Sequence, residues 1–401
     1  MNPNRKDTFS SVKTMRGFSM VELMVTLVIG LLVSLAIFSV LKISEGRKRT
    51  ITSVNDIGQT GNYAMFQIDS LVRSAGSGFS GLPDATFGCT LNGMFNGTPA
   101  TSIFGQTLAS PFATLLANIG GAFRLSPVII AKNASSAGSD VLIIMGGNSG
   151  MAEFPATLSI APTNTSVSVG STTGYGTNDI VLVTGQTSGN DRTNCYLEQV
   201  KTVSPTGLDF TNGNYSMNIP MSDSSLWDGA MVVNFGNIAK GNAPTMTLLG
   251  VGDNNTLYSY DLLKTNTLTA GNVELVADGI AEMHAVYGVD DGSGGITWVD
   301  PSGTYSAANL LNPPANTSSL LSSIKAIRIG LLTQSALPEK TAVSSGATVQ
   351  MFSDLTPAGT PAPSYSRTLN GTEQNYRFRT IESTIPIRNV LNHIQLNGGK
   401  P

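Results

Sequence analysis

Several residue types are scarce in this 401-residue chain, and each scarcity removes a class of site. There are two cysteines and two histidines, and neither cysteine belongs to a Cys-x-x-Cys pair, so no recognisable zinc-binding spacing is present. The motifs Gly-x-Ser-x-Gly and Gly-x-x-x-x-Gly-Lys-Ser/Thr are also absent. We therefore expect no catalytic residues, no cofactor and no metal, and we expect that the chain is not an enzyme.

Charge is scarce as well, because charged residues make up 12% of the chain and the formal net charge is −3. This total leaves no broad basic face, which argues against general nucleic-acid binding, although a local patch remains open. Apolar residues make up 41%, enough to form a core. Low charge with 43 glycines is typical of an extracytoplasmic β protein.

No proline occurs between Pro3 and Pro83, which allows one long helix from Phe18 to about Ala75. The run Phe18–Leu41 contains a single charge, Glu22, and as a helix would be about 36 Å long, enough to cross a bilayer core of about 30 Å. Beyond it, apolar or small residues recur three and four apart and predict an amphipathic continuation: Ile51, Val54, Ile57, Gly61, Ala64, Met65, Ile68, Leu71, Val72 and Ala75.

After Gly81 the pattern changes to short runs rich in Val, Ile, Leu and Tyr between turn residues, which predicts strands. About 360 residues follow the apolar run, so we expect one elaborated domain or two packed β-rich lobes. The predicted strands are Pro127–Ala131, Val141–Met145, Ile180–Thr184, Cys195–Val203, Ala230–Phe235, Met246–Val251, Leu257–Leu263, Asn272–Ala277, Ala281–Val289, Ile324–Thr333 and Tyr376–Ile385.

The start of the apolar run resembles the prepilin signal of type IV pilins and type II secretion pseudopilins. A short basic leader ends in Gly17, Phe18 follows, and Glu22 stands at a fixed offset inside the run. The resemblance implies that a prepilin peptidase cuts between Gly17 and Phe18 and that Phe18 becomes an N-methylated terminus. Losing this leader, with four cations and one anion, would leave a net charge of about −6.

The resemblance gives Glu22 a role in assembly, in which its carboxylate pairs with the N-terminal amine of a neighbouring subunit. A buried carboxylate becomes tolerable when another chain supplies a cation in the same apolar surroundings. An ordinary secretory signal peptide fits poorly, because the apolar run is too long and the cleavage-like glycine precedes it. A plain single-pass anchor is the remaining alternative.

The C-terminal part resembles PilW, a family of minor type IV pilins. Four blocks carry this resemblance: Leu257–Leu262, Leu275–Gly292, Ile324–Ser335 and Tyr376–Asn389. PilW-like proteins in turn resemble the minor pseudopilin GspJ of type II secretion systems. The middle, from about residue 85 to 250, resembles no family.

These resemblances imply an α+β fold, in which a long N-terminal pilin helix carries a large β-rich globular head. The expected divisions are a leader peptide at 1–17, a transmembrane or filament-core helix at 18–41 and its amphipathic continuation at 42–80. A β-rich variable region at 81–255 and a PilW-like β region at 256–401 follow.

The implied function is a minor pilin that helps initiate pilus assembly, in a priming complex near the tip. Expected partners are other pilins, the prepilin peptidase, the inner-membrane assembly platform and, before assembly, the lipid bilayer; nucleic acid is not expected as a partner. The implied location is the bacterial inner membrane, single-pass, with a periplasmic head, and then the pilus. The alternatives are a tip adhesin or DNA-contacting pilin, and a GspJ-like pseudopilin.

Three smaller features remain. In an oxidising periplasm Cys89 and Cys195 could form a disulfide worth roughly 4 to 5 kcal/mol, or stay two buried thiols. The acidic, glycine-rich stretch from Asp290 to Gly295 lacks the spacing of a calcium loop and favours a hairpin turn. His284 is expected to be packed or exposed rather than catalytic, and Arg47–Arg49 is expected to meet lipid headgroups or neighbouring subunits.

Overall fold

The computed structural model describes residues 17–81, 83–96, 101–150, 155–185, 194–227, 229–263, 273–311, 317–344, 346–355 and 363–391. The chain forms two compact units, the first ending at Asn55 and the second beginning at Asp56. Most of the predicted leader lies outside the described residues. All the strands belong to the second unit.

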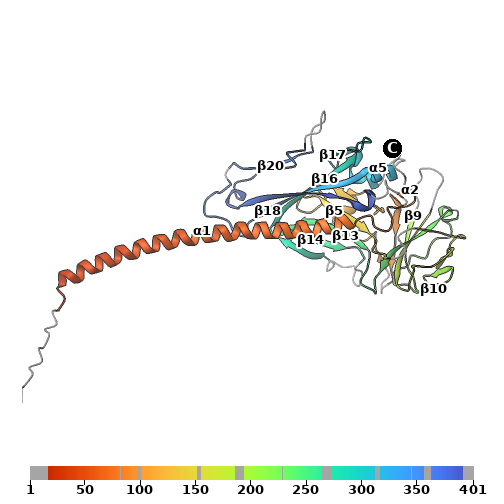
Figure 1. The fold of residues 1–401 in the computed structure, drawn as a ribbon, viewed down its shortest axis with the longest axis horizontal. Helices are drawn as coiled ribbons and strands as arrows, with labels where there is room; N and C mark the ends of the chain where they lie inside the picture. The colour runs from red at the N-terminus through yellow and green to blue at the C-terminus, as the bar shows by residue number, and fades with distance from the viewer. Residues whose placement is uncertain are drawn as a thin grey trace, which may run out of the picture. The chain divides into compact units, whose positions relative to one another are not determined.

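The predicted long helix is confirmed as α1 (Met20–Ser74), one continuous helix in Figure 1. Its residues from Met20 to Arg49 are exposed on every side. Within the second unit one face is buried, through Ile57, Gly58, Gly61, Ala64, Met65, Ile68 and Val72. The predicted stripe is therefore confirmed from Ile57 on, whereas its first two members, Ile51 and Val54, are exposed. Gly76 then takes a φ of 78°, a left-handed conformation that ends the helix.

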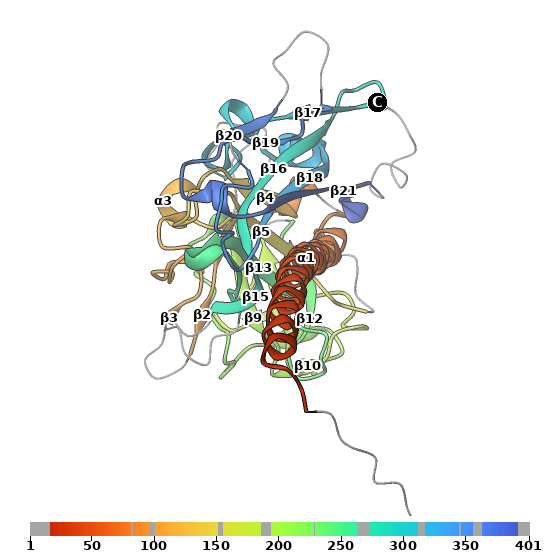
Figure 2. The ribbon, with the colours of Figure 1, turned by 90° about the vertical axis from the view of Figure 1, so that its left-hand side faces the viewer.

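Two antiparallel sheets lie behind the buried face of α1. One has the order β15-β14-β13-β5-β4 and the other the order β17-β16-β18-β21, and β16, β18 and β21 lie side by side in Figure 2. The strands are β4 (Val128–Ala131), β5 (Val141–Gly146), β13 (Thr245–Gly252), β14 (Thr256–Asp261), β15 (Val273–Asp278), β16 (Ile280–Asp290), β17 (Ile296–Val299), β18 (Ile324–Gln334) and β21 (Phe378–Pro386).

The helix approaches the second sheet closely at Gly61. A Cβ there would overlap the Cδ1 of Ile381 on β21 and lie 2.7 Å from the Cγ2 of Thr333 on β18. Only a glycine fits this contact without displacing the helix. Leu331 and Ile381 are paired across β18 and β21. The contact with Gly61 therefore lies on the face of the sheet that packs against the largest hydrophobic cluster of the described residues, here called the main core.

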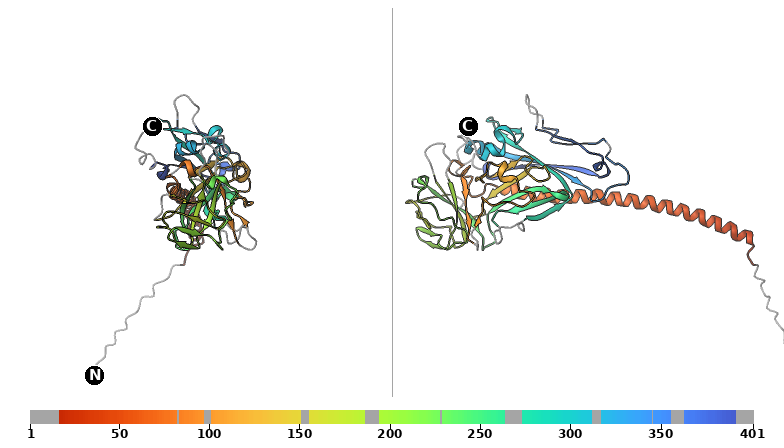
Figure 3. Two further views of the ribbon diagram at one scale, coloured as in Figure 1. Left: turned by 90° about the vertical axis from the view of Figure 1, so that its right-hand side faces the viewer. Right: turned by 180° about the vertical axis from the view of Figure 1, so that it is seen from behind.

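A third sheet, with the order β1-β9-β8-β12-β6, separates the main core from a smaller second core. Ile180 and Leu182 of β8 face the main core, whereas Val181 and Val183 face the second, as the two-residue period of a strand requires. A small sheet, β10-β11-β7, accompanies it. The strands are β1 (Thr90–Asn92), β6 (Ala156–Thr157), β7 (Ser166–Ser168), β8 (Asp179–Thr184), β9 (Asn194–Gln199), β10 (Thr202–Ser204), β11 (Gly207–Asp209) and β12 (Met231–Asn237). Of these, β7 to β11, drawn in yellow-green, gather at one end of the second unit (Figure 3).

A two-stranded ribbon of β19 (Thr348–Met351) and β20 (Tyr365–Thr368) covers the other face of the β16–β18 sheet. Met351 and Phe352 lie against Gly330 of β18, and Arg328 bridges Glu382 and Asp354. The remaining elements are short: α2 (Pro83–Thr86), α3 (Leu115–Asn118), α4 (Ala307–Leu311), α5 (Thr317–Ser323), β2 (Met94–Phe95), β3 (Thr101–Ser102), η1 (Ser224–Leu226), η2 (Asp253–Asn255), η4 (Gly303–Tyr305) and η5 (Glu373–Asn375).

The predicted α+β fold is therefore confirmed, and each predicted strand has a counterpart in the structure. One prediction needs correction, because Cys195–Val203 is not a single strand. It divides into β9 and β10, which belong to different sheets, at the point where the backbone N–H of Val200 donates to Asp179. All these sheets belong to the one compact unit that begins at Asp56.

Candidate functional site

The N-terminal end of α1 holds the residues that the sequence singled out. Gly17, Phe18 and Ser19 precede the helix, and the side chain of Phe18 is 80% exposed. The Ser19 hydroxyl accepts from the backbone N–H of Val21 at 3.3 Å and so caps the helix. Glu22 lies in the first turn, where the helix dipole favours a negative charge. The structure therefore brings Phe18 and Glu22 to the same end of one exposed helix.

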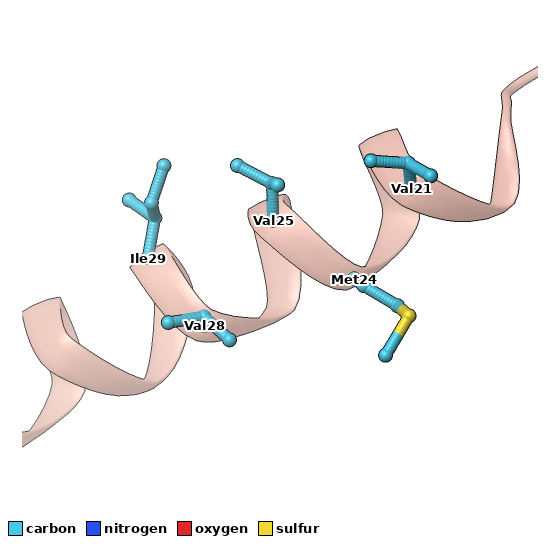
Figure 4. Close-up of a pocket in the computed structure, with 5 residues that line it drawn as sticks. All are labelled: Val21, Met24, Val25, Val28 and Ile29. Atoms are coloured by element: carbon cyan, nitrogen blue, oxygen red, sulfur yellow. The ribbon is translucent and has the colours of Figure 1, made fainter.

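A shallow apolar groove lies on the surface of the helix (Figure 4). Val21, Val25 and Ile29, spaced four apart, project from one side of the helix, and Met24 and Val28 lie beside them. By length and composition α1 holds one segment able to cross a membrane, and none of its residues is buried within the chain. Such a surface is stable only in lipid or against other apolar helices.

Cys89 and Cys195 are joined by a disulfide in the structure, with 5.7 Å between their Cα atoms. Cys89 precedes β1 and Cys195 belongs to β9, and these two strands run parallel, with Leu91 opposite Cys195. Both cysteines lie in the main core. The bond therefore ties together two segments 106 residues apart in sequence.

The acidic stretch after β16 forms a hairpin turn to β17. The Oδ1 of Asp291 accepts from the backbone N–H groups of Ser293 and Gly295 and from the Ser293 hydroxyl, at 2.7 to 3.0 Å. These bonds lower the pKa of Asp291. Within the described residues no group of three or more His, Cys, Asp or Glu side chains is placed to hold a metal ion.

His284 lies buried in β16 within a charged cluster that the strand pattern did not predict. Its ring stacks on Tyr365 of β20 with 3.8 Å between centroids, and its nitrogens lie 3.5 Å from Asp140 and 3.6 Å from Glu282. Burial alone would lower the pKa of His284, but the two carboxylates raise it to about 9. Glu282 also accepts from the Tyr365 hydroxyl and pairs with Arg367. The cluster attaches the ribbon to the sheet.

Glu198 of β9 is a second buried ionisable residue that the sequence pattern did not reveal. Along β9 its side chain points to the other face of the sheet from that of Leu197. Glu198 is paired with Val181 on the neighbouring strand, so both side chains lie on the side of the second core. One carboxylate oxygen accepts from the backbone N–H of Met217 at 3.0 Å, and the other has no hydrogen-bond partner among the described residues. Burial raises the pKa of Glu198 to about 7, against the opposing effect of hydrogen bonds from Ser216 and Met217.

The fold and this surface define a class: an α+β protein with an apolar N-terminal helix fit for association with a membrane, and a β-rich head. Residues 248–389 match the family model of PilW, described as Type IV Pilus-assembly protein W. Over these residues, which make up about a third of the chain, the protein is PilW-like, and the matched family is one of type IV pilus assembly. The matched residues run from within β13 to Asn389 and do not include α1. Neither the curated proteins nor the solved structures include a match.

Proposed function

We propose that this chain is a minor type IV pilin that helps to initiate pilus assembly, as a structural subunit of a priming complex near the tip. The main support for this proposal is that a PilW-like head region occurs together with an exposed apolar helix, whose N-terminal end carries Gly17, Phe18 and Glu22. A β-rich head alone is compatible with many functions, so the apolar helix and the PilW-like region are both needed to indicate a pilin.

In this proposal, prepilin peptidase removes the leader between Gly17 and Phe18, and the new amine is methylated. The apolar segment holds the subunit in the inner membrane, with the head in the periplasm, until the assembly platform transfers it to a bundle of pilin helices. Glu22 favours this transfer, because its charge is costly in hydrocarbon and is offset by the N-terminal amine of a neighbouring subunit.

The test is the intact mass and the N-terminal residue of the full chain, isolated from membranes of a host with a prepilin peptidase. A chain that begins at methylated Phe18 supports pilin-type processing. A chain that keeps Met1, or is cut after the apolar segment, contradicts the proposal and leaves an anchored or secreted protein. A Gly17→Leu variant, which should stay uncut, is the matched control.

A binding role for the unmatched region is the second candidate. Trp227 and Met221 are 62% and 58% exposed, and the indole N–H of Trp227 donates to the backbone of Met221 at 3.3 Å. An exposed tryptophan held in one orientation is typical of a contact residue. Under this candidate Trp227→Ser leaves piliation intact and reduces attachment or DNA uptake. Normal attachment and uptake by this variant would remove the candidate.

A further inference from the structure

A group of basic side chains projects from α1 immediately beyond its apolar segment. Lys42, Arg47, Lys48 and Arg49, here called the basic collar, lie within eight residues of Leu41, and Glu45 is the one acid among them. All four of these basic residues are exposed. Within the described part of the chain, no ion pair joins the basic collar to an acidic side chain. Its positive charge is therefore directed outward.

The basic collar begins at the level of the headgroup layer of a bilayer, and its backbone extends a few ångströms beyond that layer. Leu41 ends the apolar segment, and Arg49 lies about 12 Å further along at 1.5 Å per residue. The headgroup region adds about 5 to 7 Å on each side of the hydrocarbon core. Helical side chains incline toward the N-terminus, here toward the apolar segment, and long basic side chains extend to the interface. All four cations can therefore reach lipid phosphates.

The distribution of the basic collar around the helix favours lipid over a single protein partner. At about 100° per residue, Arg47, Lys48 and Arg49 point about 140°, 240° and 340° away from Lys42. A protein docked on one side of the helix would contact only part of this set. Phosphates surround a membrane-spanning helix on every side, so they can satisfy all four cations together.

We propose that the basic collar binds the phosphate groups of anionic lipids in the leaflet on the head side of the membrane. This binding holds the unassembled subunit at a set depth and would have to be given up when the helix leaves the bilayer. Each cation near an anionic surface contributes about a fivefold preference, which salt weakens. The inference rests on membrane association, which is part of the proposed function, but its readout needs no pilus.

The test uses the full chain, purified in detergent and mixed with equal amounts of phosphatidylglycerol and phosphatidylethanolamine of identical acyl chains. Native mass spectrometry then counts the lipids that stay bound. The wild type should retain phosphatidylglycerol preferentially, and R47Q/K48Q/R49Q should lose this preference by on the order of a hundredfold if the three contributions add. Gln keeps a high helix propensity, so α1 should persist in the variant.

The control K240Q/K340Q/R388Q removes the same charge from three exposed positions of the head. It should keep the lipid preference of the wild type. The proposal is overturned if the control loses as much preference as the collar variant, because net charge alone would then explain the effect. It is also overturned if the collar variant binds lipid like the wild type. Loss of a copurifying pilin in that second case would assign the basic collar to a protein neighbour.

Discussion

At the scale of single residues, the buried carboxyl of Glu198 is the clearest departure from the pattern of its strand. An ionised carboxylate with one unpartnered oxygen in an apolar core is costly, so the folded protein favours the protonated form. The pKa of Glu198 is higher in the folded protein than in the unfolded chain, so protonation of this carboxyl stabilises the fold. That stabilisation is complete below the unfolded pKa of 4.5. It is lost as the pH rises toward and through about 7.

We therefore expect the wild type to lose about 3 kcal/mol of unfolding free energy through this group between about pH 4.5 and pH 8. Glu198→Gln should remove that pH dependence and should be the more stable protein at pH 8. Thermal unfolding of the full chain in detergent, followed across this range, measures both effects. Asp253→Asn, at an exposed carboxylate, is the control and should follow the wild type. Parallel pH profiles for Glu198→Gln and the wild type would contradict the expectation.

At the scale of elements, the contact between α1 and the β18–β21 sheet depends on a glycine. Helix propensity alone predicts that Gly61→Ala stabilises by about 1 kcal/mol. The new methyl group would instead overlap Ile381 and Thr333, and overpacking costs about 1 to 3 kcal/mol. We expect Gly61→Ala to lower the stability of the head, measured by thermal unfolding.

Gly46 provides the matched control in the same helix, because no atom lies within 4 Å of the Cβ position there. Gly46→Ala should leave the unfolding temperature of the head unchanged and slightly increase helicity. A Gly61→Ala protein as stable as the wild type would show that the helix can move away from the sheet without cost.

The disulfide also acts at this scale, because it links the segment before β1 to β9. Closing a loop of this length stabilises by about 4 to 5 kcal/mol in the chain-entropy model. We expect Cys195→Ser to lose most of that amount, measured by unfolding under non-reducing conditions. Cys89→Ser and the double variant should lose about the same amount, since all three remove one bond. If the single variants retain wild-type stability, the bond contributes nothing to the folded state.

At the scale of the whole molecule, the proposed function requires α1 to move from a membrane to a filament. Glu22→Ala should still be processed, since the residues around the cut are unchanged, but it should be absent from sheared pili. Immunoblots of membrane and pilus fractions measure this outcome. Glu45→Ala, on the same helix but beyond the apolar segment, should enter pili normally. Normal incorporation of the Glu22 variant would refute pairing with a neighbouring amine.

How far the sequence predicts this molecule depends on the range of the interactions involved. The apolar run and the stripe beyond it together predicted a helix from Phe18 to about Ala75, within two residues of α1 at each end, because helix periodicity is a local signal. Strands such as β16 and β18 were predicted for the same reason. The ribbon of β19 and β20 was missed, since its strands are four residues each and their apolar contacts are with residues of β16 and β18.

The sequence by itself determined the membrane-length helix, its amphipathic continuation and the main strands. Each of these depends on neighbours within a few positions. The tertiary structure decided the order of strands in each sheet, the closeness of Gly61 to Ile381, and the environments of His284 and Glu198. Those features arise from contacts between residues far apart in the chain, where burial and charge depend on which segments pack together and not on local composition.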